Sequence, residues 1–384
     1  MKIVDVEAFA LSVPVKDGIV FGIGKVLRRD TVLVKVTTES GIVGYGESHH
    51  GRAAGSVAHV VNSLLKHFVI GADATDVVGI WHRIYTMQLR SHGLGAATAI
   101  AMSGIDQALW DIRGKATGWP LYKLLGGSAR KVKAYAGGVS LGWSEPAALC
   151  DEVAAAMALG YNAVKLRGGD TVARDVERAT AVRQRFGDDL TIMVDANTNY
   201  TLDDAIRALP AFRALGVAWL EEPFAPHDYR SYARADHAGV PLAAGENHYT
   251  RFEFHRLIED AHVGIIQPDL SKSGGITEVM RIAALGSAWK LPLCPHTATT
   301  GLNMAVTIHV LAATENGGYF EGDISSPNPF RDQLVSTPYT VAADGTVTPL
   351  EAPGIGVEVD EDFARAHPFV DGPAYAEIPV RGGK

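Results

Sequence analysis

The sequence lacks the features that mark several specialised classes of protein. It contains two cysteines, Cys150 and Cys294, which lie too far apart for a metal-binding pair and are too few for a disulfide framework. Cysteine this scarce is typical of a reducing compartment, so we expect a cytoplasmic protein. No apolar run approaches the roughly 20 residues that cross a bilayer, so no membrane association is expected. The start at Met1 alternates like a strand and does not resemble a signal peptide.

Positive charge is also scarce. The chain carries 35 basic and 43 acidic residues, a net charge of −8, without a basic cluster, which argues against a nucleic-acid partner. Its 384 residues are enough for more than one hydrophobic core. We expect a first domain over residues 1–127, a second, repeating domain over 128–324, and a C-terminal segment over 325–384 that folds back on the first domain. Two short strands are expected in that last segment, at 338–342 and 346–348.

The first 127 residues have an α+β pattern. Residues 2–13 alternate like a strand, and 31–47 have the pattern of a hairpin. Helical patterns follow over 56–68, 76–90 and 95–116. Two glycine-bearing segments, 14–30 and 48–55, are expected to be loops, the first of them mobile.

The middle of the chain repeats one design, a short apolar segment that ends in an ionisable residue. The endings fall about every 25 residues, the length of one strand, one helix and two short loops. They are Lys165 with Arg167, Asp195, Glu221, Glu246, Asp269, His296 and Glu321. About seven or eight such units in tandem indicate a closed α/β barrel of the TIM type. Because the carboxyl ends of the strands meet at one mouth of such a barrel, we expect these side chains to share one site.

Asp195, Glu221 and Glu246 end three consecutive strands of the predicted barrel. Adjacent strands lie roughly 4.8 Å apart, so the three carboxylates can meet at one point, where they would repel one another. A hard divalent cation relieves that repulsion, and ligand sets made only of oxygen suit Mg²⁺. The alternative is three ordinary loop acids that pair with lysines. Glu222 is expected to face away from Glu221 because side chains alternate along a strand.

Basic residues and one acid–histidine pair complete the predicted mouth. Lys165 and Arg167 share one face of their strand, where they would face a bound anion such as a substrate carboxylate, or else pair with the acids. Asp269 and His296 end neighbouring strands, and a carboxylate beside an imidazole is an arrangement used by general bases. Glu321 would hydrogen-bond a developing oxyanion if protonated, or else is a solvated acid.

A polar loop of the first domain adds candidates for substrate contact. His49, His50 and Arg52 lie in the segment 48–55 and either contact substrate or are exposed polar residues. Asn197, two residues beyond Asp195, joins His49 and Arg52 as a candidate substrate-binding residue.

Several motifs together carry a family resemblance. They are Val194-Asp195-Ala-Asn197, Glu221-Glu222-Pro223, Gly245-Glu246-Asn247, the segment from Gln267 to Gly275, and Pro295-His296. With these residues the chain resembles the enolase superfamily, and within it the mandelate racemase-like group, over essentially its whole length. The related muconate-lactonising group has a lysine where Asp269 stands here, which argues against that group.

The resemblance implies an α/β fold, a modified (β/α)7β barrel with an α+β capping domain that the C-terminal segment completes. It implies Mg²⁺ held by Asp195, Glu221 and Glu246. It further implies an acid/base dyad of Asp269 and His296, with Glu321 as electrophilic partner and Lys165 neutralising a substrate carboxylate. By the same resemblance, loops 14–30 and 48–55 would cover the mouth and choose the substrate, and the chain would assemble as a homo-oligomer, from dimer to octamer.

The expected chemistry is removal of the α-proton of a carboxylate substrate to give an enediolate. Arg167 departs from the Lys-x-Lys pattern of the family. With a pKa above about 12, it would need to lose roughly five pKa units, about 7 kcal/mol, to act as a base at pH 7. A reaction in which His296 acts first as the base and then as the acid does not require Arg167 to lose its proton. We therefore expect dehydration of a sugar acid.

Two alternatives stay open. One is a racemase or epimerase of a hydroxy acid or an amino-acid derivative. The other, from a different class, is a barrel that binds metal and a carboxylate without turnover.

Overall fold

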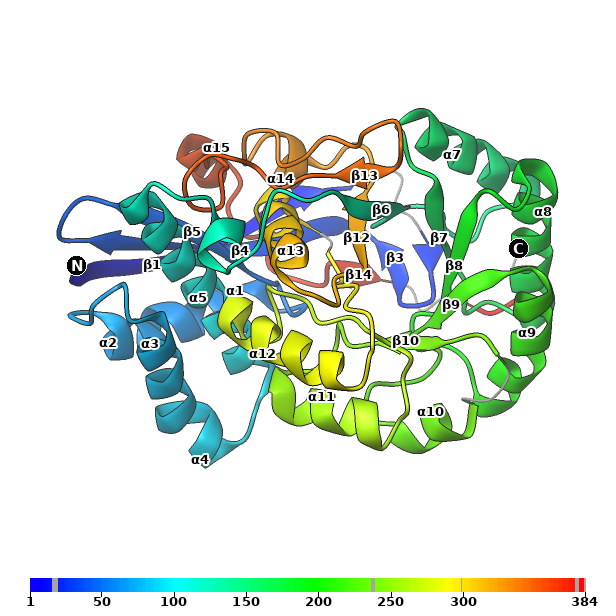
Figure 1. Ribbon diagram of the computed structural model, residues 1–384, viewed down its shortest axis with the longest axis horizontal. Helices are drawn as coiled ribbons and strands as arrows, with labels where there is room; N and C mark the ends of the chain where they lie inside the picture. Colours follow the sequence, from blue (N-terminus) through cyan, green and yellow to red (C-terminus); the bar gives the residue numbers. More distant parts are fainter. Residues whose placement is uncertain (16–19, 236–238, 298, 377–379, 383–384) are drawn as a thin grey trace.

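The molecule consists of a capping domain with a small antiparallel sheet and a curled parallel sheet surrounded by helices, which lie side by side along the longest axis (Figure 1). The computed structural model describes residues 1–15, 20–235, 239–297, 299–376 and 380–382. None of the helices in these ranges is long and apolar enough to cross a lipid bilayer.

The capping domain is built on β1 (Ile3–Pro14), β4 (Arg28–Thr38) and β5 (Val43–Ser48), which form an antiparallel sheet in that order. Helix α5 (Ala96–Thr117) packs on this sheet, and the glycines of β5 permit the close approach. A Cβ added at Gly46 would lie 2.1 Å from the carbonyl oxygen of Gly104 in α5. The small residues of β5 and α5 therefore fix the distance between sheet and helix.

The two other predicted helices of this domain are present, each interrupted by a π-helical turn. The first consists of α1 (Ala54–Val60), η1 (Val61–Leu65) and α2 (Lys66–Val69). The second consists of α3 (Val77–Ile84), η2 (Tyr85–Leu89) and α4 (Arg90–His92). A short helix, α6 (Leu121–Leu124), ends the domain.

The parallel sheet has the strand order β11-β10-β9-β8-β7-β6-β12. Its strands are β6 (Val132–Gly137), β7 (Ala163–Arg167), β8 (Thr191–Asp195), β9 (Val217–Glu221), β10 (Leu242–Ala244), β11 (Ile265–Ile266) and β12 (Tyr319–Asp323). Between β11 and β12, Leu293 makes one parallel bridge to Ile266 and one to Gly317. These bridges link the two ends of the sheet, so the predicted barrel is confirmed, with a single-residue bridge as its seventh strand.

In the part of the barrel domain that the structure describes, seven helices alternate with these strands. They cover the outside of the sheet (Figure 1). They are α7 (Pro146–Ala158), α8 (Val172–Phe186), α9 (Leu202–Ala214), α10 (Tyr229–Ala235), α11 (Thr250–Glu259), α12 (Gly275–Ala288) and α13 (Gly301–Ala313). Helix α9 begins where Thr201 and Asp204 form a reciprocal capping box, which satisfies two backbone N–H groups at the helix start. All five residues of β7 are buried because helices cover one face and the barrel interior the other.

The C-terminal segment contacts both parts of the molecule. It contains α14 (Pro329–Asp332), β13 (Thr346–Val347), α15 (Glu361–Ala366) and β14 (Tyr375–Ala376). Strand β13 pairs with β6 of the barrel. Strand β14 pairs with β3 (Gly24–Val26), which pairs with β2 (Val20–Phe21), and the amide of Phe369 donates to the carbonyl of Ala10.

Two local predictions are wrong. Residues 338–342, all within the described ranges, form no strand. Pro338 has no N–H to donate, and Tyr339 instead packs edge-on against Phe320 with ring centroids 4.9 Å apart. The segment 14–30, expected to be a loop, contains β2 and β3. Its residues 16–19 lie outside the described residues.

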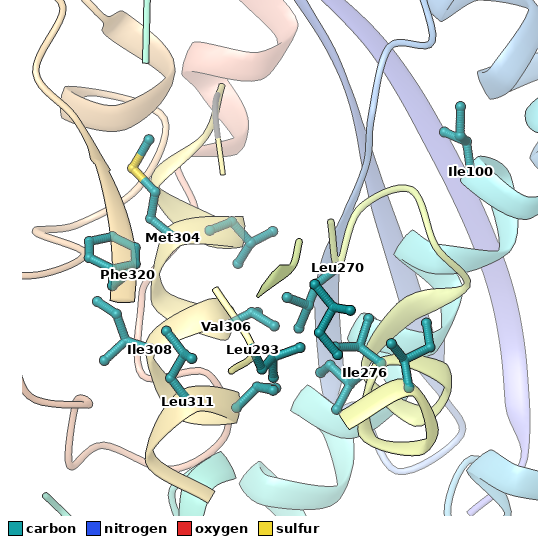
Figure 2. Close-up of a cluster of buried hydrophobic side chains, with 14 of the residues drawn as sticks. Ile100, Leu270, Ile276, Leu293, Met304, Val306, Ile308, Leu311 and Phe320 are labelled. Atoms are coloured by element: carbon teal, nitrogen blue, oxygen red, sulfur yellow. The ribbon is translucent and has the colours of Figure 1, made fainter. Parts of the chain in front are cut away.

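One continuous apolar core runs from the capping domain into the barrel. Figure 2 shows part of it, with Ile100 from α5, Ile276 from α12 and Val306 from α13. Polar side chains of the capping domain cross the same boundary: the indole of Trp81 donates to the carbonyl of Gly274, and that of Trp110 to Thr277. These contacts hold the capping domain at a fixed position on the barrel.

Candidate active site

A cavity of about 320 Å³ lies at the carboxyl ends of the barrel strands, beneath the capping domain. On the barrel side, Arg167, Glu246 and His296 line the cavity. Five buried residues lie next to them and are joined to the group by ion pairs: Lys165, Asp195, Glu221, Asp269 and Glu321. These eight residues are here named the floor. The lining residues from outside the barrel, here named the cap wall, are His49, His50, Arg52 and Tyr375. The twelve candidate residues that the sequence singled out, Asn197 among them, therefore line one cavity or lie next to residues that do.

Strand register brings the floor residues together. Asp195 at the end of β8 is the partner of Arg167 at the end of β7 and of Glu221 at the end of β9. Glu246 follows β10 by two residues. Because parallel strands in register end at the same height, the acids face one space, as predicted.

Cations lie among these acids. The ammonium of Lys165 lies 2.5 Å from Glu221, 3.0 Å from Glu321 and 3.6 Å from Asp195. Burial by itself would lower the pKa of Lys165, but these carboxylates raise it above its ordinary value, so the side chain stays charged. The guanidinium of Arg167 pairs with Asp195. Its pKa is likewise raised, because Asp195, Glu321 and Glu221 outweigh the effect of burial.

The positive charges of Lys165 and Arg167 do not fully neutralise the negative charge of the acid cluster. Burial raises the pKa of Glu221 to about 7; Lys165 opposes this shift, and repulsion by Asp195, Glu321 and Glu246 adds to it. Such a site favours a further cation, and its oxygen-only donors fit Mg²⁺. Within the described ranges, however, no three His, Cys, Asp or Glu side chains are arranged to hold a metal ion. The reason is visible in the ion pairs, because Arg167 holds Asp195, and Lys272 lies 3.3 Å from Glu246.

Asp269 and His296 form a buried pair. Nδ1 of His296 lies 2.7 Å from Oδ2 of Asp269, while Nε2 lies 3.4 Å from Glu246. Oδ1 of Asp269 accepts hydrogen bonds from the amide and hydroxyl of Ser271 at 2.7 and 2.6 Å, and from the amide of Asn303 at 3.2 Å. Although burial works against ionisation, His296, Lys272 and Ser271 lower the pKa of Asp269. The carboxylate is then only an acceptor, so Nδ1 of His296 carries hydrogen and Nε2 is left as the basic atom.

The pKa of His296 is raised above its ordinary value. Burial alone would lower the pKa of this imidazole, but the charge of Glu246 and the hydrogen bond to Asp269 outweigh that effect. The pair therefore strengthens His296 as a base.

Glu321 and Asn197 also have defined partners. Glu321 accepts from Lys165 and from the amides of Gly138 and Thr297, and Lys165, His296 and Arg167 lower its pKa against the effect of burial. As placed, Glu321 is therefore ionised and is an acceptor rather than a donor. Asn197 donates its side-chain amide to Asp195 at 3.1 Å and lines the cavity.

Glu222, which was expected to face away from Glu221, also reaches the cavity. It follows the end of β9 with a φ of +35°, and its side chain lines the cavity, as does that of Glu246. Both of its carboxylate oxygens accept from the amide of Asn247 at 3.0 Å.

Lys272 and Tyr375 are among the cavity residues that the sequence reasoning missed. Lys272 lies inside the motif from Gln267 to Gly275, and its charge beside Asp269 was the available signal. Tyr375 reaches the cavity because β14 pairs with β3, a contact between distant parts of the chain that leaves no local signal. His49 and Arg52 line the cavity as expected, together with Ile23 and Val26 from the segment 14–30.

Comparison with known proteins places this site in a family. Residues 3–126 match the N-terminal domain of mandelate racemase / muconate lactonizing enzyme, and residues 148–363 match the enolase C-terminal domain-like family. The chain is 34% identical over 333 residues to arabinonate dehydratase of Saccharolobus solfataricus, covering 86% of this chain and 88% of that relative. It is 33% identical over 352 residues to D-galactonate dehydratase of Xanthomonas oryzae pv. oryzae, covering 87% and 90%.

Solved structures agree with these relatives. A member of the enolase superfamily from Polaromonas sp. JS666 has a TM-score of 0.96 at 50% identity, covering 98% of this chain and all (100%) of the other. A racemase from Streptomyces coelicolor A3(2) with bound magnesium has a TM-score of 0.86 at 29% identity, covering 95% and 99%. Fold, floor residues and relatives thus lead to one conclusion: the chain is an enzyme of the enolase superfamily and belongs to its mandelate racemase / muconate lactonizing enzyme family.

Proposed function

We propose that this enzyme depends on Mg²⁺, removes the α-proton of a carboxylate substrate, and then eliminates water from a sugar acid. The observation that carries the proposal is the placement of His296. Its Nδ1 is held by Asp269 at 2.7 Å, and its ring borders the cavity that the acids of the floor surround. A base so placed can reach a substrate whose carboxylate is held on the floor.

The residues proposed to hold Mg²⁺ are Asp195, Glu221 and Glu246. When bound there, the ion would acidify the α-hydrogen and stabilise the negative charge that develops on the substrate carboxylate. Lys165 is proposed to neutralise the same carboxylate, since it remains cationic between Glu221 and Glu321. Asn197 is proposed to orient Asp195, to which it donates.

The proposed proton transfers use one residue. Nε2 of His296 takes the α-proton as the α C–H bond breaks, and the electron pair stays on the substrate as an enediolate. The resulting imidazolium gives that proton to the β-hydroxyl, whose C–O bond breaks, and water leaves. The enol product then becomes a 2-keto-3-deoxy acid. Proton loss and water loss occur on the same face because one imidazole serves both.

Arg167 supports elimination over racemisation. Racemisation needs a second base on the opposite face, and Lys165 and Arg167 both have raised pKa values because of the surrounding carboxylates. An arginine held in this state is a hydrogen-bond donor rather than a proton acceptor. We therefore propose that Arg167 positions substrate oxygen atoms and that Glu321 anchors Lys165.

The test is a screen of the purified protein with Mg²⁺ against aldonic and aldaric acids. Release of a 2-keto-3-deoxy acid, detected as the 2-keto acid, is the expected result. Solvent deuterium entering the α-carbon without elimination would indicate an epimerase instead. If ligands bind but no proton exchanges, the chain is a binding protein without turnover.

We also propose a cytoplasmic location and a homo-oligomeric assembly. The first is supported by Cys150 and Cys294, which are both free and buried, and the second by the family resemblance alone. Sedimentation of the purified protein would test the assembly.

A further inference from the structure

The cap wall differs from the floor because its donors have no anionic partner. Arg52 is exposed, and its guanidinium lies 4.7 Å from the ring centroid of Tyr375. Within the described residues, no carboxylate forms an ion pair with it. Its φ of +60° is a left-handed conformation that is costly for arginine, which shows that the turn is held in place by its surroundings.

The two histidines beside Arg52 are held as neutral donors. Nδ1 of His49 accepts from the amide of Gly51 at 3.0 Å, and Nδ1 of His50 accepts from the amide of Arg52 at 2.8 Å. A ring nitrogen that accepts carries no hydrogen, so in both rings the hydrogen lies on Nε2. Burial, aided by Lys272 and Arg52, lowers the pKa of His50 to about 3, and the pKa of His49 is also well below its ordinary value.

Acids near the cap wall do not satisfy these donors. Asp30 lines the same side of the cavity, but it accepts from Ser12 at 2.7 Å and from Arg28 at 2.9 Å. Lys272, which also lines the cavity, is already paired with Glu246 at 3.3 Å. The cap wall is thus a set of hydrogen-bond donors at the cavity, and Arg52 gives it a positive charge.

We propose that the cap wall binds a second carboxylate of the substrate, so that the substrate class is a dicarboxylic sugar acid rather than a monocarboxylic one. This inference rests on the proposed function, in which the floor takes the first carboxylate. A guanidinium fork and two imidazole N–H groups match the acceptors of a carboxylate. A cavity of about 320 Å³ suits a compact polar diacid.

The test compares aldaric acids with the aldonic acids of the same configuration, which differ by one terminal group, CO₂⁻ in place of CH₂OH. Two readouts are used: release of the 2-keto-3-deoxy acid with Mg²⁺, and binding by calorimetry. The expected result is a diacid preference of about 10- to 100-fold in kcat/KM that Arg52→Gln removes, as for the loss of one charge-assisted hydrogen bond. Arg52→Lys should restore part of it, and Arg90→Gln, at an exposed arginine of the same domain, should leave it unchanged.

The outcomes separate this inference from the proposed function. Equal turnover of both acids, or an equal loss for both in Arg52→Gln, overturns the second-carboxylate subsite while proton abstraction stands. A preference for the 6-phosphate of the aldonic acid over the diacid overturns the carboxylate assignment. If no acid is dehydrated but the diacid binds in an Arg52-dependent way, the subsite is supported and the proposed function fails.

Discussion

The floor and the cap wall of one cavity differ in how their charges are balanced. On the floor, each acid lies against a cation or the imidazole, as with Lys165 between Glu221 and Glu321. On the cap wall, Arg52 stacks on Tyr375 without an anionic partner among the described residues. The floor therefore holds the groups proposed for a reaction that many carboxylic acids can undergo. The cap wall holds the groups proposed to recognise the distal end of one substrate class.

The two sides are also built differently. Floor residues are placed by the register of parallel strands, which fixes Arg167, Asp195 and Glu221 beside one another. Cap-wall residues are placed by a turn with positive φ at Gly51 and Arg52 and by the pairing of β14 with β3. Turns change more readily than strand register, so related chains can keep the floor and alter the wall.

The largest expected effect is on the floor. Replacing His296 with Asn removes the proposed base, and the rate of dehydration should fall by about 10³-fold for every acid that reacts. This loss should not depend on the distal group of the substrate, in contrast to Arg52→Gln. Formation of the 2-keto-3-deoxy acid is measured by NMR, with His255→Asn as control because His255 is exposed on α11. Retained dehydration in His296→Asn would show that another residue is the base.

A second prediction concerns Glu47, which joins the capping domain to the barrel beneath the site. Its carboxylate accepts from Thr31 in β4 at 3.0 Å and from Thr300 at the start of α13. Burial raises its pKa from 4.5 to about 8, although these hydrogen bonds oppose the shift. A group with a raised pKa stabilises the fold fully below its unfolded pKa, and this contribution is lost as pH rises through the folded value.

Glu47→Gln should therefore remove a pH dependence. Between pH 5 and pH 9 the wild type should lose unfolding free energy relative to the variant, by about 1.4 kcal/mol per pH unit at most and a few kcal/mol in total. Urea denaturation at both pH values measures this. Glu7→Gln, at an exposed position of β1, should show the same difference from the wild type at each pH. If Glu47→Gln does so too, Glu47 is not protonated in the folded protein.

The smallest expected effect concerns Asn303, which donates to Asp269 at 3.2 Å and accepts from Gln107 of the capping domain at 3.2 Å. Asn303→Leu removes one donor from Asp269, so the carboxylate holds the proton of His296 more strongly. We expect kcat to fall about 10-fold and the acidic limb of the pH–rate profile to move to higher pH. Asn62→Ala, which removes an amide bound to Ala8, should leave the profile in place. An unmoved limb in Asn303→Leu would mean that Asn303 is only structural.

Sequence reasoning worked where one local rule sufficed. The barrel, its helices and the positions of Asp195, Glu221 and Asp269 followed from short apolar segments that end in charge. It failed at residues 338–342, where Tyr339 packs on Phe320 instead of joining a sheet. It also did not indicate that Glu222, with a φ of +35°, lines the cavity. Both features depend on neighbours that are remote in the chain.

By itself, the sequence determined that the ionisable residues gather at one mouth, because every strand of a parallel barrel ends on the same side. Only the tertiary structure decided which carboxylate lies against which cation, and that Arg52 meets Tyr375 above the cavity. The physical reason is the distance along the chain over which each interaction acts. The periods of strands and helices relate residues that are close in sequence. Ion pairs, cation–π contacts and the pairing of β14 with β3 join residues that are far apart in sequence, at separations that follow no regular spacing.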